Sequence, residues 1–172
     1  NYLLEYCVDR GNAIIYLNTV DKAIKVYKEV KDLVLKSGKN IPVILYHSRF
    51  TEKYKQRKEN MLLDNLGRKA WNNGIAKGIA ILTQIGEISI NISSELMISE
   101  VCPIDRLMQR AGRLCRFDNS VGEMYILIPY KDNTLYPAPY GSYSQSDKSW
   151  IPCKALLATM DILKRGIYSA QD

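Results

Sequence analysis

Three arginines and a glutamine lie close together in this sequence, as Gln109, Arg110, Arg113 and Arg116. If the stretch is one helix, Arg113 and Arg116 share a face because they are three residues apart. Two guanidinium groups there would present fixed forks of N–H donors that could clamp a triphosphate. At about 100° per residue, Arg110 lies close to Arg113 and far from Arg116, so the cluster would form a broad positive edge.

Local ion pairs would account for the same arginines equally well. Arg106, Arg110 and Arg113 could pair with Asp105, Asp118 or other nearby carboxylates. Spacing alone therefore leaves phosphate binding and structural pairing open, and the elements that position the cluster have to be considered.

Strand and helix patterns alternate along most of the chain, without an internal repeat. Apolar runs predict strands over 12–17, 41–46, 78–83, 96–100 and 123–128. Helical spacing predicts one helix from Asn18–Thr19 to Gly38, one over 52–66, and one from Pro103 through Leu114. We therefore expect an α/β fold in which helices cover both faces of a parallel sheet.

The segment after the last strand breaks this alternation. Residues 129–152 hold four of the six prolines and many aromatic residues, which predicts a long loop packed on its own tyrosines. Base stacking is the alternative, although only Lys131 and Lys148 accompany the aromatics. A last helix is predicted over 152–168. The expected division is one domain over 1–128, with residues 129–172 packed on it.

Positive charge is concentrated in one part of the chain. Residues 21–69 hold 13 Lys and Arg against 6 Asp and Glu, whereas the whole chain of 172 residues holds 24 against 18. This distribution suits a polyanionic partner, although lysines on the solvated face of a helix give the same count. The composition excludes collagen, a coiled coil and wholesale disorder. No apolar run approaches the roughly 20 residues that cross a bilayer, so we expect no membrane partner.

The cysteines do not predict a metal site. Cys7, Cys102, Cys115 and Cys153 match no zinc-ligand spacing, and His47 is the single histidine, so we expect no metal site and a structural His47. Reduced, buried thiols favour a cytoplasmic protein. Because the chain begins at Asn1 without a signal peptide, we expect a fragment of a longer protein.

The arginine cluster resembles motif VI of superfamily 2 helicases, which reads Q-R-x-G-R-x-G-R. Other blocks fall in the order of that superfamily: Asn18–Thr19 fits motif IV, Ile44–Thr51 resembles the segment between motifs IV and V, and Thr83–Ile92 resembles motif V. The combination of H-S-R-F-T, T-Q-x-x-E-x-S and C-P-I-D-R-L-M-Q-R-A-G-R is similar to the CRISPR-associated helicase of type I interference systems. The resemblance covers about 10–130 and implies a second RecA-like domain.

The resemblance implies specific roles for residues of these motifs. Arg113 and Arg116 would act as arginine fingers, and Gln109 would sense the γ-phosphate or its attacking water. Nucleotide contacts would come from Asn91, Glu87 and Arg110. Strand contacts would come from Ser48, Arg49, Thr83, Asn18 and Thr19. The alternatives are a helix cap for Ser48, an ion pair with Glu52 for Arg49, and a strand-terminal turn for Thr83.

The resemblance further implies ATP with magnesium as cofactor, held mainly by a first RecA-like domain. This chain contains no G-x-x-x-x-G-K-[ST] loop and no D-E-x-H-type acidic pair, so the fragment alone should be inactive. The implied partners are single-stranded DNA, the guide-RNA surveillance complex, and an HD-type nuclease that is fused or separate.

Three departures from the family pattern keep other functions open. Asn91 stands where a carboxylate is expected near the ribose, Ser93 stands where the family writes a second Asp, and Cys115 stands where glycine is common. One alternative is half of another superfamily 2 DNA or RNA helicase, although a DEAD-box protein would favour A-R-G-L-D in motif V. The other is a degenerate RecA-like module that binds nucleic acid or protein without hydrolysis.

Overall fold

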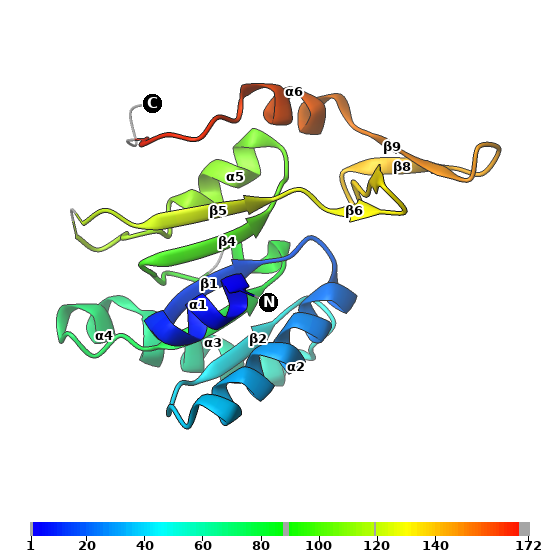
Figure 1. The fold of residues 1–172 in the computed structure, drawn as a ribbon. Helices are drawn as coiled ribbons and strands as arrows, with labels where there is room; N and C mark the ends of the chain where they lie inside the picture. Colours follow the sequence, from blue (N-terminus) through cyan, green and yellow to red (C-terminus); the bar gives the residue numbers. More distant parts are fainter. Residues whose placement is uncertain (1, 88–89, 119, 169–172) are drawn as a thin grey trace.

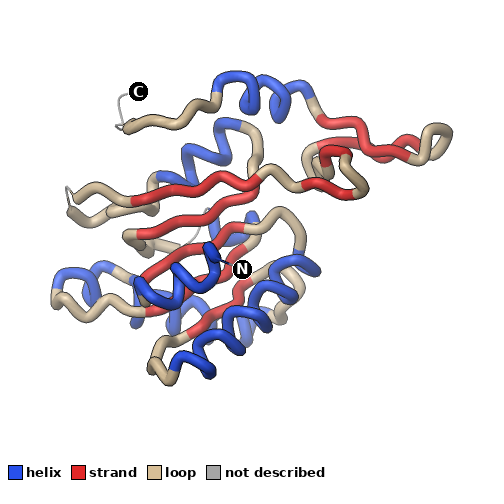
Figure 2. The backbone as a smooth tube through the Cα atoms, in the orientation of Figure 1, coloured by secondary structure: helices blue, strands red, loops and turns tan. Residues whose placement is uncertain are grey.

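The computed structural model describes residues 2–87, 90–118 and 120–168. Within these ranges the centre of the molecule is a parallel five-stranded sheet in the order β2-β3-β1-β4-β5 (Figure 1, Figure 2). The strands are β1 (Asn12–Tyr16), β2 (Val43–Tyr46), β3 (Gly78–Leu82), β4 (Leu96–Glu100) and β5 (Glu123–Leu127). The predicted α/β fold with a parallel sheet is confirmed, and its second strand starts two residues later than expected.

Helices cover both faces of the sheet, as predicted. On one face, α1 (Tyr2–Arg10) and α2 (Val20–Ser37) pack on a core cluster that includes Ile15 and Ile81. On the other face, α3 (Glu52–Leu66) packs on a second cluster that includes Ile14 and Tyr16. The short α4 (Arg68–Asn72) follows α3. Helix α1 was not predicted, although Leu3, Leu4, Cys7 and Val8 have helical spacing.

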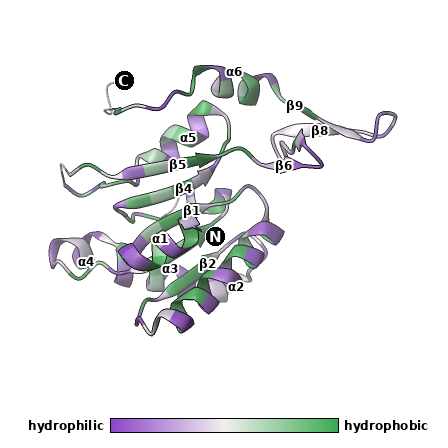
Figure 3. Ribbon diagram, viewed as in Figure 1, coloured by the Kyte–Doolittle hydropathy of each residue, from purple (hydrophilic) through white to green (hydrophobic). Residues whose placement is uncertain are grey.

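The central strands are apolar because both of their faces are covered. All five residues of β1, β3 and β4 are buried, whereas β5 at the sheet edge is more open. In Figure 3 the strands are mainly hydrophobic, and hydrophilic residues gather on the outward side of α2. Among the described residues, no helix is both long and apolar enough to span a membrane.

The helix that carries the arginine cluster is shorter than predicted. Helix α5 spans Ile104–Ala111, starts after Pro103 and stops at Gly112, rather than continuing to Leu114. Beyond it, Cys115 has a φ of 46°, a left-handed value that no α-helix tolerates. Arg113 and Arg116 therefore do not lie on one helix face, and the expected paired clamp is not formed by helical spacing.

The Tyr/Pro-rich segment contains two hairpins where we expected a long loop. They are β6 (Tyr130–Lys131) with β7 (Thr134–Leu135), and β8 (Gly141–Ser144) with β9 (Ser149–Pro152). The aromatics do pack on one another, because the Trp150 ring lies 5.5 Å from Tyr136 and 5.8 Å from Tyr143. Tyr143 and Trp150 face each other across the β8–β9 hairpin, a favourable aromatic pair that the nearby prolines led us to overlook.

The last helix, α6 (Lys154–Ile162), is also shorter than predicted. It contacts α5 and buries Leu156 and Thr159. In Figure 1, α6 lies beside α5, and the β8–β9 hairpin extends away from the sheet.

Candidate nucleotide and strand-binding site

Glu87 is the centre of the arginine cluster. It ends the short helix η1 (Gln84–Glu87) that follows β3, and its carboxylate is buried. Oε1 accepts a 2.8 Å hydrogen bond from Nε of Arg110, and Oε2 accepts one of 3.1 Å from Arg106. The hydrogen bond and the charge of Glu87 raise the pKa of Arg106. The structural pairing that spacing left open is thus present, with Glu87 as the acceptor.

Arg110 is completely buried and has no N–H group to spare. Besides Glu87, its guanidinium donates to Ser99 Oγ at 2.9 Å and to the Glu100 carbonyl at 3.0 Å. It also donates to Asn18 Oδ1 at 3.2 Å and to the Tyr140 hydroxyl at 3.4 Å. These bonds use all five donors of a guanidinium. A nucleotide contact by Arg110, as the sequence suggested, would have to break this network.

Asn18 joins the ends of several strands. Its backbone N–H donates to Glu100 Oε2 at 2.7 Å, and its side-chain amide donates to the Val101 carbonyl at 2.8 Å. Its own carbonyl accepts a 2.8 Å bond from Gln84. Through these bonds Asn18 links the end of β1 to β4 and to η1. It is also buried, so a residue expected to contact the nucleic-acid strand instead positions these elements.

Arg113 turns toward the backbone of the motif V segment. Its guanidinium donates to the carbonyls of Glu87, Ile90 and Gln109, and only 6% of the residue is exposed. Carbonyl oxygens satisfy the charge through hydrogen bonds without a carboxylate partner. In this conformation Arg113 holds motif V against the end of α5.

Arg116 and Gln109 differ from Arg113 in that both are exposed. The Arg116 backbone N–H donates to Ser93 Oγ at 2.8 Å, and its guanidinium contacts only the Gly112 carbonyl among the described hydrogen bonds, at 2.9 Å. Ser93 is buried, so a fixed hydroxyl anchors the backbone while the side chain reaches outward. Ser93 therefore has a structural task at this departure from the family pattern.

Asn91 is also exposed and follows the motif V segment. Two residues of the predicted motif V, Ile88 and Ser89, lie outside the described residues. An exposed amide so close to Arg113 and Ser93 can accept a hydrogen bond from a ribose hydroxyl. The described parts of motifs V and VI are in contact, because Arg113 donates to the carbonyls of Glu87 and Ile90.

The predicted strand contacts lie at the carboxyl ends of β1, β2 and β3. Ser48 and Arg49 are exposed in the turn after β2, and Thr19 is half-buried at the start of α2. Thr83 is buried, and its carbonyl accepts from Gly86, which is the predicted turn. Thr51, whose side chain makes no capping hydrogen bond, occupies the N-cap position of helix α3, so Ser48 is not at that position.

Arg49 pairs with Asp21 at 2.7 Å and not with Glu52. Both side chains are exposed, so the pair contributes at most about 1 kcal/mol and leaves Arg49 available for a phosphate. On α3, burial, with the charges of Arg57 and Lys31, lowers the pKa of Lys58. His47 is stacked on Phe50, and its pKa is lowered mainly by burial.

The cysteines are free and show no sign of a metal centre. Burial raises the pKa of Cys7 to about 12 and that of Cys102 to about 11. Within the described ranges, no group of three or more His, Cys, Asp or Glu side chains could hold a metal ion.

Sequence reasoning missed several members of the network. They are Lys22, Ser99, Glu100 and Tyr140, while Arg106 was considered only as an ion-pair partner of Asp105, Asp118 or other nearby carboxylates. Arg106 and Arg110 are four residues apart, so their shared face was a usable signal. Tyr140 gave none, because it lies in a proline-rich segment without a periodic pattern.

Comparison with known proteins identifies the family. Residues 9–119 match the family model described as CRISPR-associated nuclease/helicase Cas3, C-terminal. The chain belongs to the Cas3 family. A putative CRISPR-associated nuclease/helicase Cas3 of Methanocaldococcus jannaschii is 38% identical over 125 residues, which cover 68% of this chain and 16% of that protein. The chain thus corresponds to a small part of the Cas3 protein that it matches.

Solved structures share the fold of this chain, and the family model matches the C-terminal part of Cas3. A crystal structure of T. fusca Cas3-ATP is 28% identical with a TM-score of 0.65, and the match covers 75% of this chain and 16% of that one. A chain of a CRISPR RNA-guided surveillance complex, pre-nicking, shares the fold at 21% identity and a TM-score of 0.62, with coverage of 90% and 21%. The chain is therefore a C-terminal RecA-like domain of Cas3 type.

Proposed function

We propose that this chain is the second RecA-like half of an ATP-dependent motor that translocates on single-stranded DNA in CRISPR type I interference, in antiviral defence. Residues 1–128 form the RecA-like domain in this proposal, and 129–172 form a unit packed on it. The observation that carries the proposal is Arg116, whose backbone is fixed by Ser93 while its guanidinium is exposed.

The proposed partners follow from the family. They are single-stranded DNA, a guide-RNA surveillance complex, and an HD-type nuclease on the same or a separate chain. Support comes from the surveillance complex that contains a similar chain and from the nuclease/helicase names of the relatives.

The exposed residues of motifs V and VI fit one half of a nucleotide site. Arg116 offers positive charge to phosphate oxygens, Gln109 offers an amide to the γ-phosphate, and Asn91 offers one to the ribose. Bound ATP with magnesium would supply the phosphoanhydride hydrolysis that powers movement. The motif that cradles its other phosphates and the acidic pair for magnesium would come from the first RecA-like domain.

The two arginines predicted as fingers have different roles in this proposal. We assign phosphate contact to Arg116 and a positioning role to Arg113, because three carbonyls already hold the Arg113 guanidinium. Strand contact is assigned to Ser48, Arg49 and Thr19, which are at least partly exposed. Thr83 and Asn18 are buried and would shape this surface from beneath.

The test is DNA-stimulated ATPase activity of the full-length protein. Arg116→Ala should lower kcat by about 10³-fold or more, the range found for arginine fingers, with an unchanged melting temperature. Arg10→Ala is the matched control, because Arg10 lies in an exposed pair with Glu95 and should leave kcat unchanged.

The Arg113→Ala variant distinguishes a positioning role from direct phosphate contact. Arg113→Ala should lower both kcat and the melting temperature, because it leaves motif V without its brace. Normal turnover in the Arg116→Ala protein would overturn the assignment of the finger. The present chain alone should show no ATPase activity.

A degenerate, non-hydrolysing module is the second candidate, and the burial of Arg113 favours it. It requires a full-length protein that binds single strands in a salt-dependent way but has no ATPase activity. Detection of DNA-stimulated hydrolysis would exclude this candidate.

A further inference from the structure

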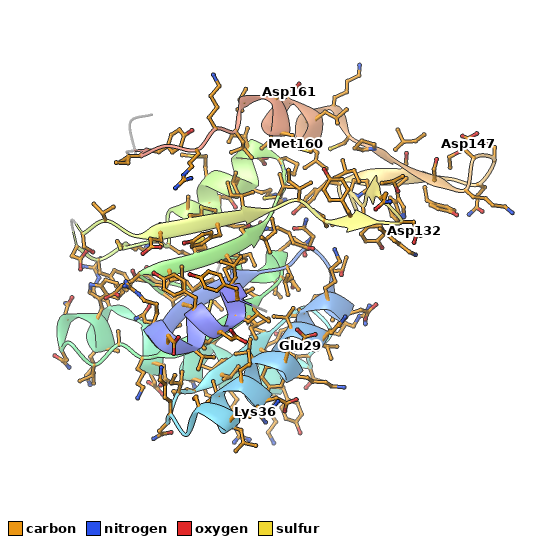
Figure 4. All side chains as sticks on the ribbon, in the orientation of Figure 1. Glu29, Lys36, Asp132, Asp147, Met160 and Asp161 are labelled. Atoms are coloured by element: carbon orange, nitrogen blue, oxygen red, sulfur yellow. The ribbon has the colours of Figure 1, made fainter. Side chains whose placement is uncertain are left out.

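Residues 136–153, here called the arm, include the β8–β9 hairpin and lie outside the part of the chain that the family model matches. In Figure 4 the labelled Asp147 lies at the far end of this hairpin, away from the sheet and from α2. The base of the arm, in contrast, reaches the arginine network. The arm therefore connects an outlying surface to the centre of motifs V and VI.

Tyr140 makes the first of two connections. Its hydroxyl accepts from Nη2 of Arg110 at 3.4 Å. Its backbone is held by the Pro137 carbonyl at 2.7 Å and by the Cys153 N–H at 2.9 Å. Burial raises the pKa of Tyr140 to about 12, so the hydroxyl stays neutral at physiological pH. Hydrogen bonds therefore hold both the backbone and the hydroxyl of Tyr140 in place.

Tyr136 makes the second connection. The Lys22 ammonium lies 5.0 Å from the centre of the Tyr136 ring and 2.6 Å from Glu100 Oε1. The other oxygen of Glu100 accepts from the backbone N–H of Asn18. The positive Lys22 ammonium is attracted to the electron-rich face of the ring.

Both connections meet at Asn18. Gln84 donates to its carbonyl, Arg110 to its side-chain oxygen, and Glu100 accepts from its N–H. Arg110 in turn holds Glu87, whose carbonyl accepts from Arg113. A movement of the arm would therefore displace groups at the ends of β1 and β4 and in both motif V and motif VI.

We propose that Tyr140 is a positioning residue through which the arm sets the orientation of Arg110 and thereby the activity of motifs V and VI. The proposal rests on the proposed motor function for its kinetic consequence. Its structural consequence, the ordering of η1 and α5 by the arm, stands without that function.

The test compares two single-atom changes in the full-length protein. Tyr140→Phe keeps the ring and removes the hydroxyl from the network. Tyr143→Phe removes a hydroxyl from the same arm, on a ring that packs against Trp150 and is 45% exposed. Tyr143→Phe should match the unaltered protein in every measurement.

Tyr140→Phe should lower the DNA-stimulated kcat about fivefold, with the KM for ATP within twofold and the melting temperature unchanged. A merely structural tyrosine would lower the melting temperature and leave the kcat of folded protein intact. In the same protein, amide hydrogen exchange in 84–87 and 104–111 should be about fivefold faster.

Hydrogen exchange keeps the two proposals distinguishable. If the unaltered protein has no ATPase activity, the motor function fails, and exchange alone decides whether the arm orders these segments. Unchanged exchange in Tyr140→Phe, or an unchanged kcat in an active protein, overturns the positioning role.

Discussion

Arg110 and Arg116 belong to one motif and have opposite surroundings. Arg110 is fully buried and its guanidinium donates to five groups of this chain, including Tyr140 of the arm, whereas Arg116 is exposed with a backbone anchored at Ser93. The difference arises because α5 ends at Ala111 and the chain turns at Cys115. Arginine thus builds the site at position 110, and in the proposed function arginine also contacts the phosphate at position 116.

The largest expected effect tests this division directly. Arg110→Met should lower the free energy of unfolding of the chain by about 3–5 kcal/mol, because removing one partner of a buried ion pair leaves Glu87 with less compensation. Arg116→Met should change it by less than about 0.5 kcal/mol. Urea unfolding followed by circular dichroism measures both. Equal losses would show that the two arginines do not differ in role.

A smaller effect tests the turn that separates them. Cys115→Val should lower the free energy of unfolding by about 2 kcal/mol, since a β-branched side chain is strained at the φ of 46° found here. Cys115→Gly should be tolerated, because glycine adopts this conformation without strain. Thermal unfolding of the two variants gives the comparison. Equal stability would mean that the left-handed turn is not required.

The smallest effect concerns the exposed strand surface. In a plot of log K for single-stranded DNA against log salt concentration, Arg49→Ala should reduce the slope by about 0.7, the value for one phosphate contact. Asp21→Asn removes the exposed partner of Arg49 and should preserve the slope. Titrations of labelled DNA at several salt concentrations measure it. An unchanged slope in Arg49→Ala would place the strand elsewhere.

The sequence predicted the sheet and its covering helices well, because apolar strands and helical spacing are local signals. The sequence alone could not predict that the Arg113 and Arg116 side chains lie in different surroundings, because that depends on where α5 ends and on the backbone conformation of Cys115.

The roles of Asn18 and Arg110 were equally out of reach. Both were expected to face a ligand, but both are buried. Asn18 bonds to Glu100 and Val101, and Arg110 bonds to Asn18, so each of these contacts joins residues more than 80 positions apart. The part played by Tyr140 depends on the folding of a segment whose prolines hide its hairpin. Such long-range contacts leave no mark on spacing.

The shared carboxylate of Glu87 also constrains how this domain can change over time. Arg106 and Arg110 both donate to this one buried carboxylate, so a neutral residue at 87 would leave the fully buried Arg110 guanidinium without an anionic partner. We expect positions 87, 106 and 110 to be replaced together, as a matched set, in any distant homologue that builds this region differently.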